Sequence, residues 1–177
     1  NQYWVHKNHK IVLEALRILK QQGKVVRVVS TGNTKDYRNP SYFAALEEFI
    51  KNHALQDRYI ILGIVPYADV QALSEAAWAY INPSLFEGWS TTVEEAKYRG
   101  KAILLSDLKV HREQAPKKGV YFDPMDPDEL ADKMWNIWNR DDMKEEEITA
   151  LEIAHQKAMK AFAETYCGIL GEGKKDR

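Results

Sequence analysis

One short stretch of this chain combines acidic, hydroxyl and glycine residues in an order that could bind a charged ligand. Residues 87–92 read Glu-Gly-Trp-Ser-Thr-Thr, and a second glutamate, Glu95, follows them. The apolar run 78–82, which ends at Pro83, predicts a strand of a parallel sheet that is covered on both faces. The stretch is therefore expected to form the loop at the end of a buried strand.

The hydroxyl residues of this stretch predict the start of a helix. Thr91 fits an N-cap and Glu94 stands three residues later, a capping-box spacing that would begin the helix at about Thr92. A helix that begins directly after a parallel strand presents unpaired N–H groups and a positive dipole end at the carboxyl edge of the sheet, where doubly wound folds bind phosphates. Gly88 would let ligand and backbone come close.

The two glutamates, Glu87 and Glu95, predict a different partner. A carboxylate repels a phosphate but accepts hydrogen bonds from neutral hydroxyl groups. A phosphate site flanked by two hydroxyl-binding acids favours a nucleotide diphosphate that carries a sugar.

This stretch is similar to the Glu, seven residues, Glu signature of the retaining glycosyltransferases of family 4, which have the two-domain GT-B architecture. Glu87 and Glu95 stand at that spacing, and the resemblance extends over residues 3–137. Four further landmarks follow the family's order. They are Lys7-Asn8-His9 opening a helix, Gly63 ending a strand, Ser106-Asp107 after another strand, and the run from Phe122 to Leu130.

The resemblance implies a role for each residue of the donor site. Lys7 would stabilise the diphosphate and Glu87 would hold the sugar, so these two are the expected catalytic residues, while Glu95 would bind the ribose. Gly63 and Val65 resemble the segment whose backbone brackets the base, although Gly63 could also be a plain strand-ending glycine. The expected donor-binding residues are Gln2, Gly32, Gly63, Val65, Gly88, Trp89, Ser90, Thr91, Thr92 and Glu95.

The chain departs from the family pattern at three positions. Ser90 and Thr92 stand where many members have a glycine and a proline, which gives the phosphate loop more hydroxyl groups. Gln2 stands where the family usually has an arginine on the diphosphate, so Lys7 is expected to supply the cationic charge alone.

Helical and strand patterns alternate along the chain. This alternation predicts a Rossmann-like, doubly wound parallel sheet in an α/β/α three-layer arrangement, the C-terminal half of a GT-B enzyme. The predicted helices cover residues 7–22, 40–50, 68–76, 92–99 and 127–138, with Leu130, Met134, Ile137 and Trp138 as the apolar stripe of the last one. The predicted strands cover residues 25–30, 59–62, 78–82, 102–105 and 120–122.

At 177 residues the chain has the length of one ordinary domain, and its 45% hydrophobic content suffices for one core. We expect a nucleotide-sugar-binding domain over residues 1–140 whose first strand is truncated, a C-terminal helix over 141–167 and a flexible tail over 168–177. The N-terminal acceptor domain of the same protein would be a separate part.

Composition disfavours several other classes of protein. A net charge of −1 gives no electrostatic reason to expect nucleic acid as a partner, and no apolar run approaches the length that spans a membrane. The single cysteine, Cys167, suits a reducing cytoplasm. The full-length enzyme could also contact the inner membrane peripherally. No metal ligands stand at zinc spacing, and neither metal nor cofactor is expected. The segment 111–113 could reach a cleft or form a surface turn.

The resulting hypothesis is retaining transfer of a glycosyl group from a nucleotide diphosphate to an acceptor hydroxyl, in bacterial polysaccharide or lipopolysaccharide biosynthesis. Lys7 and the amides of Ser90 to Thr92 would stabilise the departing diphosphate. Two alternatives remain open. A nucleotide-sugar 2-epimerase of related fold would convert the donor without an acceptor, and a non-catalytic nucleotide-binding module would need no second domain.

Overall fold

The structure of the protein is a computed structural model that describes residues 2–139. Helices and strands alternate as predicted, while the helix and tail expected over 141–177 lie outside the described residues. The elements are η1 (Val5–Lys7), α1 (His9–Gln21), β1 (Val28–Thr31), α2 (Pro40–Asn52), β2 (Tyr59–Gly63), α3 (Tyr67–Ala76), β3 (Ala79–Asn82), α4 (Thr91–Tyr98), β4 (Ala102–Ser106), α5 (Lys109–Gln114), β5 (Gly119–Phe122) and α6 (Pro127–Trp138). Helix α3 belongs to a second compact unit, and all the other elements belong to the first.

All the strands pair in parallel, which confirms the Rossmann-like α/β fold. Strands β1 and β2 form one ladder, and β3, β4 and β5 form a second in that order. Asn82 at the end of β3 pairs with Leu105, and Thr31 at the end of β1 pairs with Gly63. Because parallel strands all end on the same side of their sheet, each ladder places the loops that follow its strands along one edge.

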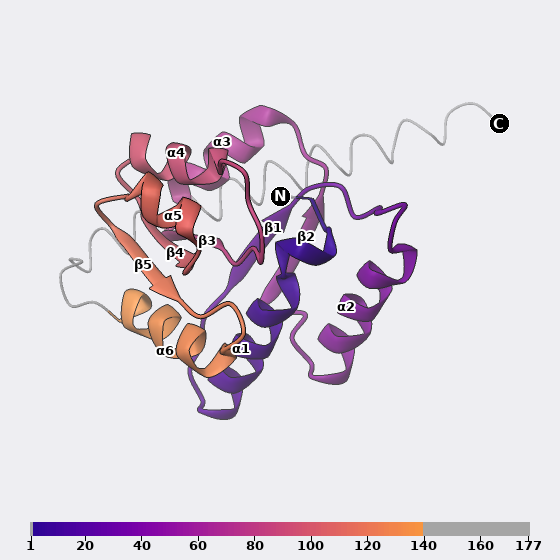
Figure 1. Cartoon of the computed structure of the whole chain (residues 1–177). Helices are drawn as coiled ribbons and strands as arrows, with labels where there is room; N and C mark the ends of the chain where they lie inside the picture. Colours follow the sequence, from indigo (N-terminus) through magenta and orange to yellow (C-terminus); the bar gives the residue numbers. More distant parts are fainter. Residues whose placement is uncertain (1, 140–177) are drawn as a thin grey trace. The chain divides into compact units, whose positions relative to one another are not determined.

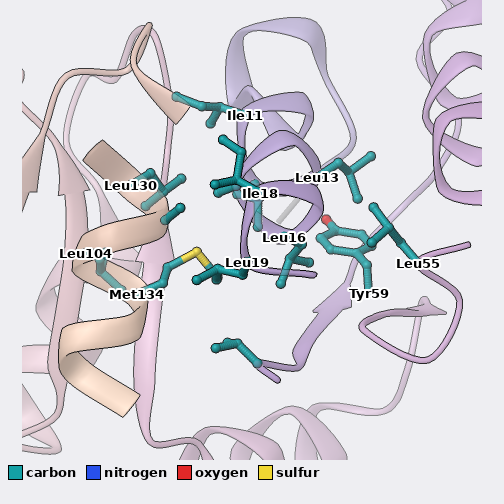
Figure 2. Close-up of a cluster of buried hydrophobic side chains, with 14 of the residues drawn as sticks. Ile11, Leu13, Leu16, Ile18, Leu19, Leu55, Tyr59, Leu104, Leu130 and Met134 are labelled. Atoms are coloured by element: carbon teal, nitrogen blue, oxygen red, sulfur yellow. The ribbon is translucent and has the colours of Figure 1, made fainter. Parts of the chain in front are cut away.

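Helix α1 lies between α6 and α2 and forms the centre of the hydrophobic core (Figure 1). Figure 2 shows its side chains reaching Leu104, Leu130 and Met134 on one side and Leu55 and Tyr59 on the other. One cluster of buried side chains therefore takes residues from both ladders. The buried residues of α1 cover more than one narrow stripe of the helix and are His9, Ile11, Val12, Leu13, Ala15, Leu16, Ile18 and Leu19.

Strand β4 is buried on both faces. Leu104 belongs to the cluster around α1, whereas its neighbours Ile103 and Leu105, which are also fully buried, point to the opposite face because side chains alternate along a strand. Helix α4 contacts β3, β4 and α5 and covers that second face. The β3–β5 ladder is thus the middle layer of the predicted α/β/α arrangement.

The start of α6 is capped by a side chain, that of Asp126. Asp126 accepts hydrogen bonds from the amides of Asp128 (3.0 Å) and Glu129 (2.9 Å), and Pro127 occupies the first turn, where no N–H is needed. The apolar stripe is confirmed at Leu130, Met134 and Ile137, but Trp138 is 45% exposed. Its ring instead lies 5.8 Å from that of Trp78.

One predicted helix begins later than expected, and one helix was not predicted. The helix expected over 7–22 begins only at His9, because Asn8 takes a left-handed conformation (φ 52°) that separates η1 from α1 and leaves Lys7 outside the α-helix. Helix α5 was missed, since six residues are too few to show a helical period. Within the described residues, no helix has both the length and the apolar content needed to cross a membrane.

Candidate functional site

The loop between β3 and α4 carries the site predicted from the sequence. Strand β3 ends at Asn82, which is buried, and the chain continues through Pro83 and Ser84, also buried, before it turns outward. The amide of Leu85 donates a 2.7 Å hydrogen bond to the carbonyl of His6. This bond joins the loop to η1, and so brings together two segments that are far apart in the sequence.

An ion pair between Lys7 and Glu87 lies at this junction. Lys7 Nζ is 2.7 Å from Glu87 Oε1, and the two side chains are only 15% and 11% exposed. Oε1 also accepts from Ser84 Oγ at 2.8 Å and from Asn82 Nδ2 at 3.4 Å. Among the described residues, each of these contacts uses Oε1, which leaves Oε2 of Glu87 for a ligand.

The electrostatics of the pair keep Glu87 ionised. Burial alone would raise the pKa of Glu87, but the hydrogen bonds from Lys7 and Ser84 outweigh it and hold the pKa below its ordinary value. Burial, reinforced by the positive charge of Lys7, lowers the pKa of nearby His6. At neutral pH the junction therefore holds one anion and one cation in contact.

The start of α4 differs by one residue from the prediction. Ser90, not Thr91, is the N-cap, and its Oγ accepts from the amide of Val93 at 3.4 Å. Ser90 is buried and its Oγ accepts a second hydrogen bond, from Asn82 Nδ2 at 2.8 Å, which fixes this hydroxyl at the start of the helix. Thr91 is exposed and lies in the first turn instead. Glu94 consequently lies beyond the capping-box position.

The backbone of Ser90 is bound by Gln114 of α5. Gln114 Oε1 accepts from the Ser90 amide at 3.3 Å, and Nε2 donates to the Ser90 carbonyl at 2.9 Å. Of the three amides expected to bind phosphate, the Ser90 amide is therefore already bound by Gln114, which leaves those of Thr91 and Thr92. The amides of Thr91 and Thr92 lie in the first turn, where a helix supplies no acceptor.

Two of the predicted donor-binding glycines, Gly32 and Gly63, lie together at the ends of β1 and β2. The amide of Gly32 donates a 2.7 Å hydrogen bond to the carbonyl of Gly63, and Gly63 has a φ of 67°, a conformation that favours glycine. Val65, two residues further, is half-buried.

The remaining predicted donor residues are mostly exposed. Gly88, Trp89, Thr91 and Glu95 face solvent, Trp89 at 58%, and Thr92 is half-buried. Gln2 is exposed, and its carbonyl lies 3.1 Å from Nε2 of His9. Among the residues that the structure describes, no hydrogen bond or ion pair joins the side chain of Gln2 or Glu95 to the Lys7–Glu87 pair.

Three residues of the site were missed by sequence reasoning: Asn82, Ser84 and Gln114. Asn82 and Ser84 flank a proline at the end of a strand, and polar residues at a strand end were their only signal. Gln114 had no signal in the sequence, because it lies in α5 and its contacts are with Ser90 and Glu94, about twenty residues earlier in the chain. The segment 111–113 lies within α5 and is not a surface turn. His111 is fully buried and pairs through Nδ1 with the Ser106 carbonyl at 2.8 Å, while Arg112 lines a cavity at the ends of β4 and β5.

A cavity of about 440 Å³ lies at the ends of β4 and β5, and its lining includes neither Lys7 nor Glu87. Its cations are already paired, Arg112 with Asp107 and Lys133 with Glu129, and Arg112 covers the ring of Tyr121 at 3.8 Å. Among the described residues, the cavity therefore offers no unpaired cation to an anionic ligand. Across residues 2–139, no cluster of three or more His, Cys, Asp or Glu side chains could hold a metal ion.

Comparison with known proteins identifies related sequences. Residues 3–151 match the family model described as glycosyl transferases group 1. The O-antigen chain mannosyltransferase RfbU of Salmonella typhimurium is 23% identical over 134 residues, covering 76% of this chain and 36% of RfbU. One subunit of the phosphatidylinositol N-acetylglucosaminyltransferase of Arabidopsis thaliana is 30% identical over 86 residues, 49% of this chain and 19% of that protein. The chain thus spans about a third or less of these relatives' length.

Several solved structures share the fold of this chain. HepE of Anabaena, in complex with UDP, superposes with a TM-score of 0.70 at 21% identity, covering 95% of this chain and 47% of HepE. A glycosyltransferase of Rickettsia africae gives a TM-score of 0.68 at 21% identity, over 100% of this chain and 47% of that one. The family model matches residues 3–151, which is most of this chain, and the chain has the Rossmann-like fold of the GT-B enzymes. The chain therefore belongs to the glycosyl transferases group 1 family.

Proposed function

We propose that this domain binds a nucleotide diphosphate sugar and takes part in its transfer, with retention at the anomeric carbon, to an acceptor hydroxyl. The observation that carries the proposal is the mostly buried contact between Lys7 and Glu87 beside the start of α4. This contact places a cation and a hydroxyl-binding anion side by side, as the two ends of a phosphate–sugar bond require.

The pair can bind such a donor without separating. An ammonium group has three hydrogens and Lys7 uses one on Glu87, so the others can donate to phosphate oxygens. Glu87 retains Oε2 to accept from a sugar hydroxyl. The bond between the anomeric carbon and the phosphate oxygen would then lie between the two side chains.

Catalysis would rest on stabilisation of the leaving group. As the anomeric carbon–phosphate oxygen bond breaks, negative charge grows on the diphosphate, where Lys7 and the amides of Thr91 and Thr92 would stabilise it. The acceptor oxygen forms the new bond on the same face of the sugar, and its proton passes to the departing phosphate. Glu95 would bind the ribose, and the backbone of Gly63 and Val65 would bracket the base. No metal or cofactor is required by this scheme.

The rest of the proposal concerns the whole enzyme. The length of the relatives supports a second domain that binds the acceptor. The name of the O-antigen mannosyltransferase RfbU supports bacterial polysaccharide or lipopolysaccharide synthesis, and the UDP bound to HepE supports a nucleotide diphosphate donor. Such an enzyme would act in the cytoplasm, either free or at the inner face of the membrane.

The test is transfer by the enzyme that contains this chain, supplied with UDP-, GDP- and ADP-sugars and with polysaccharide acceptors. NMR of the product should show the anomeric configuration of the donor. Lys7→Met should lower kcat at least 100-fold, because a lost leaving-group contact affects the transition state most. Lys10→Met, on the exposed side of α1, is the matched control. An inverted product, or a Lys7→Met effect confined to KM, would contradict the proposal.

A further inference from the structure

Gln114 uses both of its Nε2 hydrogens and its Oε1 atom to bind the first turn of α4. This residue ends α5 and is 3% exposed. Its Oε1 accepts from the Ser90 amide, and its two Nε2 hydrogens reach the Ser90 carbonyl and Glu94 Oε1, each at 2.9 Å. A reversed amide would set like groups against one another at all three contacts, so the orientation of the side chain is fixed.

The helix that carries Gln114 is itself fixed to the sheet. His111, which is fully buried, binds the carbonyl of Ser106 at the end of β4 through Nδ1. Arg112 binds Asp107 in a two-point contact of 2.6 and 2.7 Å. Gln114 therefore holds Ser90 from a short, well-anchored element and not from a loop.

Ser90 passes this constraint on to the rest of the site. Its Oγ accepts from Asn82 Nδ2 at 2.8 Å, and the same Nδ2 lies 3.4 Å from Glu87 Oε1. The contacts thus continue from Gln114 through Ser90 and Asn82 to Glu87 and, at 2.7 Å, to Lys7. Because the Ser90 amide is already taken, the orientation of the next two amides, those of Thr91 and Thr92, depends on how Ser90 is held.

We infer that Gln114 is a positioning residue that orients the first amides of α4 toward the diphosphate of the donor. This inference rests on the proposed function, and it names a residue outside the donor loop. A glutamate has nearly the same shape but no donor hydrogens, so Gln114→Glu would lose both Nε2 contacts and set a carboxylate against Glu94.

The experiment compares Gln114→Glu with Gln22→Glu, which makes the same chemical change on an exposed side chain. The affinity for UDP, GDP and ADP is measured by calorimetry, and that for the nucleoside of the best binder by NMR titration. Gln114→Glu should weaken binding of the nucleoside diphosphate about tenfold and binding of the nucleoside less than twofold, because only the diphosphate group would contact the α4 amides. Glu94→Gln/Gln114→Glu, in which an amide again faces a carboxylate, should regain part of the loss.

Three outcomes would overturn the inference. First, Gln114→Glu could weaken binding of the diphosphate and of the nucleoside equally, which would mean a general structural effect. Second, Gln114→Glu could bind the diphosphate as tightly as Gln22→Glu does. Hydrogen exchange of the Ser90 and Val93 amides, which needs no ligand, should accelerate in Gln114→Glu, and unchanged rates would also overturn it. A wild-type chain that binds no diphosphate would contradict the proposed function, while the exchange rates would still decide the part of Gln114.

Discussion

Acidification should destabilise the protein through His9, the buried first residue of α1. Its ring is 6% exposed and stacks on Tyr3 with centroids 4.3 Å apart, while Nδ1 lies 2.9 Å from the hydroxyl of Tyr59. Burial, assisted by the charge of Lys7, outweighs the bond to the Gln2 carbonyl and lowers the pKa of His9 from 6.5 to about 4. The folded protein therefore holds His9 neutral at pH values where the unfolded chain protonates it.

The size of the effect follows from the two pKa values. The unfolded state binds the proton below pH 6.5 and the folded state only near 4, so the contribution of neutral His9 is complete above 6.5 and is lost as the pH falls toward 4. At about 1.4 kcal/mol per pKa unit, this separation amounts to about 3 kcal/mol. Integrated to pH 5, the loss is already about 2 kcal/mol.

Urea unfolding of wild type and His9→Phe at pH 7.5 and pH 5.0 measures this loss. Phenylalanine keeps the stacking on Tyr3 but cannot titrate, so the fall in unfolding free energy between the two pH values should be about 2 kcal/mol smaller in the variant. His53→Phe, on an exposed side chain, is the control and should keep the wild-type pH dependence. Equal pH dependence of wild type and His9→Phe would refute the reasoning, as would an NMR titration that places the protonation of His9 near pH 6.5.

Three further predictions concern the site and the core. Lys7→Met should lower the unfolding free energy by about 3 kcal/mol in urea denaturation, because it leaves the mostly buried Glu87 without its cation. Lys7→Met/Glu87→Gln should regain part of this free energy, and a double variant that regains none would argue against a stabilising ion pair. Gly88→Ala should change the unfolding free energy by less than about 0.5 kcal/mol because an added Cβ meets no atom within 4 Å, yet should weaken diphosphate binding at least fivefold in calorimetry; undiminished binding would mean that the ligand does not approach there. Leu16→Ala, in the middle of the core, should cost about 3 kcal/mol in the same denaturation assay, and a cost below about 1 kcal/mol would contradict the packing around α1.

The parts of the fold that could be predicted are those encoded by neighbouring residues. The start of α6 depends on Asp126, Pro127 and Glu129, which lie within one turn, so its sequence predicts its structure. The apolar period of α1 and the continuous apolar run of β4 likewise predicted where these elements lie. By contrast, the left-handed conformation of Asn8, which leaves Lys7 outside α1, was not predictable. A lysine and an asparagine before an apolar period are as compatible with the first turn of a helix as with the segment that precedes it.

The candidate site could be predicted only in part, because its residues are supported from elsewhere in the chain. Glu87 and Lys7 were expected to face the same ligand, and they lie in direct contact. The choice of Ser90 over Thr91 as the cap depends on Asn82 and on Gln114, which lies on another helix, and no local pattern contains that information. Glu95 and Gln2 are placed on the surface, and their roles stay predictions.

The most direct test of the account is a calorimetric titration of UDP, GDP and ADP into the chain, with Lys7→Met and the matched Lys10→Met beside the wild type. We expect one nucleotide to bind with a dissociation constant between roughly 10 μM and 1 mM, which corresponds to about −4 to −7 kcal/mol. Lys7→Met should weaken it at least tenfold and Lys10→Met less than twofold. If no nucleotide binds to the folded chain, or if both lysine variants bind as the wild type does, the Lys7–Glu87 pair is not a diphosphate-sugar site.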